Sequence, residues 1–401
     1  PFPPPTIGIP DHMNPSEMIP LELWSLVYAF VARIHWAYPV SLPDGMWPPG
    51  AWTAGRAFAN SCTAFRHQGW YHRTMSVRLS CRSFRTWTHE YSHGLVWARI
   101  ALTDSPNGCY DNDTDFTVAL WYLQQRAPML LRLQLIIEPD GGMGPDNFRL
   151  LGGLNFSSSL QHLHFTAECC DIDTDSALHL GLLGRTRNIF TLHLGLNRSS
   201  LGPGAAQRLA QVTESSPLVG LSVSLDGCSL GDDGAVAIAD LSRNWYLAHL
   251  RLSLRCNFFY DAGGAALAEI PKRHGLQSLT MVLSDNYISD SSAWAFADLG
   301  PRGTLASLDL VFNGNRLGDS MAQSLAAAIH GAPTVRKVRL SLEVGSIGDV
   351  GAHALSSIMY LPRVVALDLS LRFNQVGPVG QHMLLGDQSG KVASQNRFVL
   401  C

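Results

Sequence analysis

The strongest constraint on this chain is a repeat of 29 residues that begins at residue 160. Eight successive units start at Leu160, Ile189, Leu218, Leu247, Leu276, Leu305, Val335 and Val364, and only one step, of 30 residues, departs from the period. We number the positions of each unit from zero at these residues. A fixed period of this length is typical of a solenoid, because one unit cannot cover its own apolar face and must stack on its neighbours.

The residue pattern within each unit predicts a strand, a turn and a helix. Positions 3, 5 and 7 are apolar, as in Leu250, Leu252 and Leu254, and this period of two is typical of a strand with one buried face. A small polar side chain recurs at position 10, where it can bond unpaired backbone groups of adjacent turns. Its members are Cys170, Ser199, Cys228, Asn257, Asn286, Asn315, Gly345 and Asn374. Apolar residues at position 20 and again at 23 or 24 have helical spacing.

The repeated pattern L-x-x-L-x-L-x-L-x-x-N-x-L-G-D-x-G-A resembles the leucine-rich repeat, in its ribonuclease-inhibitor-like class. This resemblance covers roughly residues 125 to 401. It implies an α/β solenoid shaped as a horseshoe, with parallel strands on the concave side and helices outside. One extra apolar alternation precedes the Asn position, so we expect strands about two residues longer than the family usually has.

Two helical patterns lie in the first seventy residues. Pro20 suits a helix start, Glu22 suits the first turn, and Leu23, Val27 and Phe30 share one face. With a second pattern at residues 57–66, followed by Trp70, they resemble an F-box. The matching residues are Pro20, Glu22, Leu23, Trp24, Val27, Tyr28, Phe30, Val31, Cys62, Phe65, Arg66 and Trp70. Two departures are a gap longer by roughly twenty residues and Thr63 in place of the usual Lys.

An F-box ahead of a leucine-rich array resembles the F-box leucine-rich-repeat proteins. In that family the F-box docks onto the adaptor subunit of a cullin-based ubiquitin ligase, and the horseshoe holds the protein to be modified. This implies a substrate receptor whose partners are the adaptor and a substrate protein. The alternative structure is a plain helical cap over the first repeat. The alternative function is a structural or accessory subunit of a large assembly, with the horseshoe as its scaffold.

We expect five segments along the chain. These are a Pro-rich extended arm at 1–18, a helical F-box-like or capping region at 19–72, irregular opening repeats at 73–159, eight repeats at 160–393, and a closing strand or tail at 394–401. Irregular opening repeats are expected because terminal repeats cap the stack.

The concave face is the expected surface for a protein partner, because its strand residues point away from the core. Small side chains at position 6 form its floor, and charges of both signs at positions 4 and 8 form its edges. Such charges set register more than affinity. The candidates are His164, Glu168, His193, Asn197, Asp226, Arg251, Arg255, Asp309, Arg339, Glu343, Asp368 and Arg372. A solvated sheet face without a ligand is the alternative.

The sequence offers little chemistry for catalysis. Cys169 and Cys170 lie near His162 and His164, but without metal-ligand spacing, so we expect no metal, no cofactor and no enzymatic activity. Cys170 and Cys228 occupy the Asn position and are interpreted as repeat residues, which favours a reducing compartment.

Charge and hydropathy exclude two further classes of partner. The net charge of -3 gives no electrostatic reason for nucleic-acid binding, and no run of apolar residues is long enough to span a membrane. We expect an intracellular protein, cytoplasmic or nuclear, or an organellar one if a targeting segment was removed before Pro1.

Overall fold

The computed structural model describes ten stretches of the chain. They are residues 74–79, 97–102, 131–137, 148–149, 151–152, 160–183, 188–213, 217–299, 304–385 and 397–399. The chain divides into two compact units. The first unit comprises residues 1–141 and 156–160, and the second comprises residues 142–155 and 161–401.

The first unit contains three parallel strands, β1 (Thr74–Leu79), β2 (Trp97–Leu102) and β3 (Arg132–Ile137). Their register aligns Val77 with Ile100, and Ile100 with Leu135. In β3, alternate residues are buried, among them Leu133 and Leu135. The apolar alternation that marks the regular repeats therefore also shapes these irregularly spaced strands.

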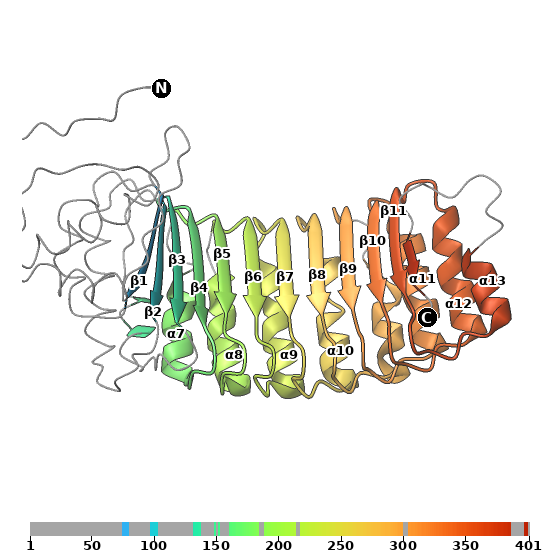
Figure 1. The fold of residues 1–401 in the computed structure, drawn as a ribbon, viewed down its shortest axis with the longest axis horizontal. Coiled ribbons are helices and arrows are strands. Elements are labelled where there is room, and N and C mark those ends of the chain that lie inside the picture. The colour runs from blue at the N-terminus through green and yellow to red at the C-terminus, as the bar shows by residue number, and fades with distance from the viewer. Residues whose placement is uncertain are drawn as a thin grey trace, which may run out of the picture. The chain divides into compact units, whose positions relative to one another are not determined.

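The second unit is built on nine parallel strands in chain order (Figure 1). They are β4 (His162–Ala167), β5 (Thr191–Gly195), β6 (Gly220–Ser224), β7 (His249–Ser253), β8 (Ser278–Val282), β9 (Ser307–Val311), β10 (Lys337–Ser341), β11 (Ala366–Ser370) and β12 (Arg397–Val399). From β4 to β11, residues at the same repeat position face each other, as Leu192, Leu221 and Leu250 do. The 29-residue period therefore sets the register of the sheet.

Each strand from β4 to β11 is followed by a helical segment, and these segments cover one face of the sheet (Figure 1). The α-helices are α7 (Thr174–Leu182), α8 (Gly202–Ala210), α9 (Gly231–Ala239), α10 (Asp261–Leu267), α11 (Asp319–Gly331), α12 (Asp349–Ser356) and α13 (Pro378–Leu385). The 3₁₀ segments are η3 (Gln211–Thr213), η4 (Asp240–Arg243), η5 (Ile270–Lys272), η6 (Asp290–Ala297) and η7 (Ser357–Tyr360). In the fifth repeat η6 stands where the others have an α-helix.

The core lies between the sheet and the helices. Leu250, Leu252 and Leu254 on the strand side, Phe259 after the turn and Leu267 on α10 are at most 2% exposed. Burying each side chain of this size contributes about 1.5–3 kcal/mol to the free energy of folding. Every repeat supplies one layer of such side chains, and the stacked layers form a continuous apolar interior. The second unit is a leucine-rich-repeat solenoid with an α/β architecture, as predicted.

The small polar residues at position 10 form a ladder between adjacent repeats. Oδ1 of Asn257 accepts hydrogen bonds from the backbone N–H groups of Cys228 (3.0 Å) and Leu230 (3.4 Å). Its Nδ2 donates to the carbonyl of Leu225 at 2.8 Å. Cys228 takes the same place in its own repeat, where its Sγ donates to the carbonyl of Leu196 at 3.1 Å. The predicted bonding to backbone of adjacent turns is confirmed.

We expected strands about two residues longer than the family usually has, and the observed strand length differs from this expectation. The regular strands β5 to β11 end at position 6 and have five residues each. The interstrand bonds nevertheless continue, because the N–H of Leu196 donates to the carbonyl of Ser224 and the N–H of Arg198 to that of Asp226. At position 9 the chain then turns sharply.

Position 9 has a positive φ in all eight repeats, and this feature was not predicted. Its members are Cys169, Arg198, Gly227, Cys256, Asp285, Gly314, Val344 and Phe373, with φ between 54° and 71°. Only two of them are glycine, the residue that takes this left-handed conformation without steric cost. The turn is therefore imposed by stacking in most repeats, because the side chains themselves disfavour it.

Candidate protein-binding face

The helices cover one face of the sheet, and the opposite face is open (Figure 1). The side chains of positions 2, 4, 6 and 8 of the second unit belong to this opposite face, because positions 3 and 5 are buried against the helices. We call it the open sheet face. In β6, β9 and β11 the burial pattern alternates, with positions 3 and 5 buried and positions 2, 4 and 6 partly accessible. All twelve residues predicted for partner binding belong to positions 4 and 8 of this face. Their role in binding a partner stays a prediction.

Most hydrogen-bond acceptors at position 8 are engaged inside the sheet. Oδ1 of Asn197 accepts from Oγ of Ser224 at 2.7 Å, and Oδ1 of Asp226 accepts from Oγ of Ser253 at 2.8 Å. The same oxygens accept from the backbone N–H of the next position 8, Asp226 (3.0 Å) and Arg255 (2.8 Å). These side chains therefore join neighbouring repeats.

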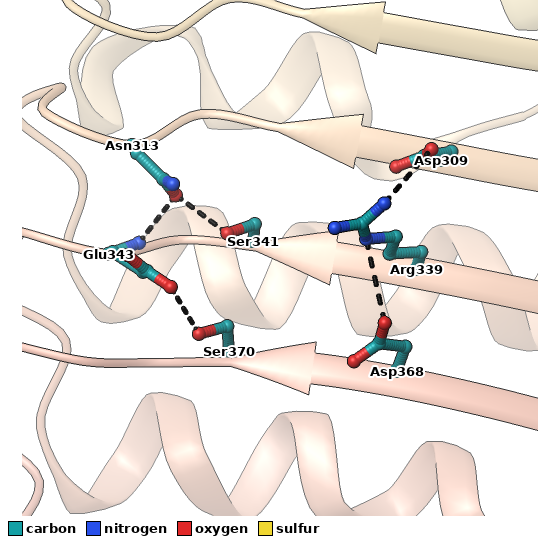
Figure 2. Close-up of polar contacts among 7 residues, drawn as sticks. All are labelled: Asp309, Asn313, Arg339, Ser341, Glu343, Asp368 and Ser370. Atoms are coloured by element: carbon teal, nitrogen blue, oxygen red, sulfur yellow. Dashed lines mark hydrogen bonds and ion pairs between the residues drawn. The ribbon is translucent and has the colours of Figure 1, made fainter. Parts of the chain in front are cut away.

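The side chains of position 8 form hydrogen bonds of the same kind near the C-terminal end of the second unit (Figure 2). Oδ1 of Asn313 accepts from Oγ of Ser341 at 2.8 Å and from the N–H of Glu343 at 2.9 Å. The carboxylate of Glu343 accepts from Oγ of Ser370. At the other end, Oε1 of Glu168 accepts from Nδ2 of Asn197 at 3.1 Å. Carboxylate and amide groups that we predicted to meet a partner thus have internal partners.

The series of hydrogen bonds made by position 8 is interrupted in the middle of the sheet. Position 8 holds Arg255 in the fourth repeat and Ser284 in the fifth, and the next strands carry Val282 and Val311 at position 6 instead of serine. A valine cannot donate a hydrogen bond, so acceptor and donor are lost together. Oγ of Ser284 is buried without a hydrogen-bond partner in the described part of the chain.

Arg339 on β10 is neutralised by carboxylates on both neighbouring strands (Figure 2). Its guanidinium lies 3.8 Å from Asp309 on β9 and 3.5 Å from Asp368 on β11. Burial raises the pKa of the Asp309 carboxyl, and the positive charge of Arg339 only partly opposes this. The charges predicted at these three positions therefore form a local ion-pair network rather than free binding groups.

Arg251 and Arg255 on the fourth repeat have a different environment. Both are exposed, and no ion pair involves either guanidinium within the described residues. On the adjacent strands Arg251 faces Ser222 and Thr280 at its own position. Arg372 is also exposed without such an ion pair; it lies one strand from Glu343, as Arg255 lies one strand from Asp226.

The histidines at position 4 form a stacked pair. The rings of His164 and His193 have centroids 4.0 Å apart at an interplanar angle of 22°. Burial lowers the pKa of His193 to about 4, and the neighbouring His164 and Arg251 add to this shift. A histidine with this pKa is neutral at physiological pH, so it contributes packing here rather than charge.

An exposed aromatic cluster at the edge of the sheet was not predicted. Phe258 and Tyr260 are 51% and 53% exposed, and both stack on Tyr287, with ring centroids 6.3 Å and 5.1 Å away. The guanidinium of Arg316 lies 5.2 Å from the Tyr287 centroid. The sequence signal was available, since Phe258, Tyr287 and Arg316 share position 11 of successive repeats.

The ten residues predicted to bind the ligase adaptor lie outside the described residues. They are Pro20, Glu22, Leu23, Trp24, Val27, Tyr28, Phe30, Cys62, Phe65 and Trp70. The small helical region expected ahead of the repeats falls in the same part of the chain.

The described residues offer no grouping of three or more His, Cys, Asp or Glu side chains that could hold a metal ion. Cys169, Cys170, Cys228 and Cys256 are free thiols. Among the helices that the structure describes, none has the length and apolar character needed to cross a bilayer.

Comparisons with known proteins return fold similarity only. No protein-family model matches the chain, and no curated protein does. The crystal structure of an internalin (inlF) from Listeria monocytogenes matches with a TM-score of 0.41 and 13% identity, covering 81% of this chain and 86% of that one. The crystal structure of the Rad7 and Elc1 complex in yeast matches with a TM-score of 0.40 and 16% identity, covering 88% and 82%.

Proposed function

We propose that this chain is a non-enzymatic protein-interaction module, and specifically an F-box-type substrate-receptor subunit of a cullin-based ubiquitin ligase. The observation that carries the binding role is the pair of exposed arginines of the fourth repeat, Arg251 and Arg255. Neither has an ion pair among the described residues, whereas most hydrogen-bond acceptors at position 8 of the sheet face are bonded internally. Cationic groups that the fold does not use are available to a partner, and interfaces are enriched in arginine.

The ligase role is supported by the sequence resemblance at residues 19–31 and 62–70. A receptor needs two surfaces, one for the ligase adaptor and one for the protein to be modified. The F-box-like segment supplies the first in this proposal, and the open sheet face supplies the second.

The test is complex formation with a recombinant adaptor subunit of a cullin-based ligase, measured by co-purification and by titration. We expect the intact chain to form a stable complex. Trp24→Ala should weaken it by about ten-fold or more, as for a truncated aromatic anchor. Trp245→Ala is the matched control, because Trp245 is 78% exposed in the second unit and lies outside the F-box-like segment.

Failure of the intact chain to bind the adaptor, or equal binding by the Trp24→Ala variant, would overturn the ligase role. Binding of a protein ligand by the open sheet face in the same preparation would then favour the alternative function, a structural or accessory subunit.

A further inference from the structure

One region of the open sheet face has a net positive charge. Along β6, β7 and β8, positions 2, 4, 6 and 8 carry only Arg251, Arg255 and Asp226 as charged side chains. Oδ1 of Asp226 already accepts from Ser253 and from the backbone N–H of Arg255. His249 at position 2 is the only other titratable group among these positions.

On the other strands from β4 to β11 the same face is balanced or negative. Over β9 to β11 the cations Lys337, Arg339 and Arg372 are matched in number by Asp309, Glu343 and Asp368. Over β4 and β5 the one carboxylate is Glu168, beside the histidines. From β4 to β11, the excess of positive charge therefore lies in the middle of the face, where the hydrogen bonds of position 8 are also interrupted.

The positive charge of Arg251 affects the pKa values of two groups on other strands. Its charge contributes to the lowered pKa of His193 on one side and opposes the raised pKa of Asp309 on the other. A guanidinium can hold a carboxylate through two parallel N–H···O bonds, which is the strongest pairing available to such a group.

The aromatic cluster lies close to Arg255 along the chain. Phe258 follows Arg255 by three residues, so their Cα atoms are at most about 11 Å apart. Phe258, Tyr260 and Tyr287 present stacked, partly exposed rings at that end of β7 and β8. Exposed aromatic and arginine side chains together are the usual composition of binding hot spots.

We propose that the middle of the open sheet face binds an acidic peptide segment of the partner protein, with two carboxylates on Arg251 and Arg255 and an adjoining apolar side chain on the Phe258–Tyr287 rings. Arg251 and Arg255 are four residues apart on an extended chain, which separates their Cα atoms by about 13 Å. An extended ligand therefore presents its two carboxylates with the same spacing. This inference rests on the proposed function, since it specifies the chemistry of the substrate segment.

The probe is a fluorescent synthetic peptide with two glutamates four positions apart and a leucine three positions beyond the second, measured by anisotropy on the full chain. One comparison peptide has glutamine in place of both glutamates, and another has phosphoserine. We expect the glutamate peptide to bind and the glutamine peptide to bind about ten-fold more weakly or not at all. Tighter binding of the phosphoserine peptide would identify phosphorylation as the natural source of the charge.

The decisive variants are Arg251→Ala with Arg255→Ala, compared with Arg339→Ala. The double variant should lose about ten-fold or more in affinity for the glutamate peptide, because both anchors are removed. Arg339→Ala should stay within about two-fold, since this arginine is equally part of position 4 but is held between Asp309 and Asp368. Arg251, Arg255 and Arg339 are all exposed, so we expect the variants to fold. Circular dichroism of each variant checks this.

Equal binding of the glutamate and glutamine peptides, no binding of either, or an unaffected double variant would overturn this inference. Adaptor binding is measured on the same preparations. Loss of peptide binding with the adaptor complex intact would leave the ligase role standing, and the reverse result would leave the acidic-segment site standing. The two proposals therefore fail separately.

Discussion

At the residue scale, the charge state of His193 depends on its neighbours. Its ring stacks on His164, and both burial and the positive charges of His164 and Arg251 lower its pKa to about 4. In the unfolded chain the pKa of a histidine is about 6.5, so between these values the unfolded state binds a proton that the folded state excludes. As far as His193 is concerned, the free energy of unfolding has its full value above about pH 6.5, where the ring is neutral in both states. It decreases as the pH falls towards 4, because the unfolded chain then binds the proton.

We predict that the free energy of unfolding falls by on the order of 2 kcal/mol between about pH 7 and about pH 4.5 because of His193. His193→Gln removes the titrating group, so the pH dependence of this variant should be shallower by that amount. Urea unfolding of both proteins at the two pH values measures the difference. An identical pH dependence in the variant would show that His193 keeps its ordinary pKa.

A second residue-scale prediction concerns the ladder at position 10. Asn257→Cys removes the acceptor for the N–H groups of Cys228 and Leu230, which remain buried, and should lower the free energy of unfolding by about 2–3 kcal/mol. Cys228→Asn makes the reverse change at the equivalent position and should be neutral or stabilising by about 1 kcal/mol. Chemical denaturation measures both. If both substitutions lowered the free energy of unfolding equally, position 10 would not have the same role in the two repeats.

At the element scale, the starts of α10, η6, α11, α12 and α13 are each held to the preceding repeat by an aspartate. Oδ1 of Asp319, the first residue of α11, accepts from the N–H of Gly348 at 2.7 Å and of Gly351 at 2.8 Å, both at the start of α12. Asp349 does the same for Gly377 and Gly380 at the start of α13. Each of these aspartates therefore joins its own helix to the next repeat.

These bonds explain the glycine at position 16. A Cβ on Gly351 would lie 2.6 Å from Oδ1 of Asp319 and 2.8 Å from Cγ2 of Ile347. We predict that Gly351→Ala lowers the free energy of unfolding by about 2–3 kcal/mol through this overpacking. Gly331→Ala at the end of α11 is the matched control, because its Cβ would meet nothing within 4 Å, and it should be neutral or slightly stabilising. Thermal or urea unfolding distinguishes the two; equal effects would exclude the close contact.

At the scale of the whole second unit, stability is shared between neighbouring repeats. Deleting residues 247–275 joins Tyr246 to Leu276 and restores every position of the repeat. Since each repeat contacts mainly its neighbours, we predict that this protein still folds, with lower stability but a cooperative transition. Deleting only residues 247–260 joins Tyr246 to Asp261 and breaks the period at this point. It should therefore lower stability further and uncouple the unfolding of the repeats on its two sides.

Circular dichroism and urea unfolding of the two deletion proteins test this prediction. The in-register deletion also removes Arg251 and Arg255, so it should retain its fold while losing affinity for the glutamate peptide. Equal loss of structure in both deletions would contradict a stack of interchangeable repeats.

The amino-acid pattern alone was enough to predict the repeat, the order of strand, turn and helix, and the buried aliphatic rows of residues such as Leu250 and Leu367. It could do so because periodic burial leaves a periodic apolar pattern. Three features became evident only in the folded stack: the left-handed turn at Val344 and Phe373, the bonds from Asp319 to the next helix, and the charges that are neutralised. These features join residues about one repeat apart in the chain, and stacking alone brings them together. Arg251 and Arg339 therefore look alike in the sequence, but only Arg339 lies between two carboxylates.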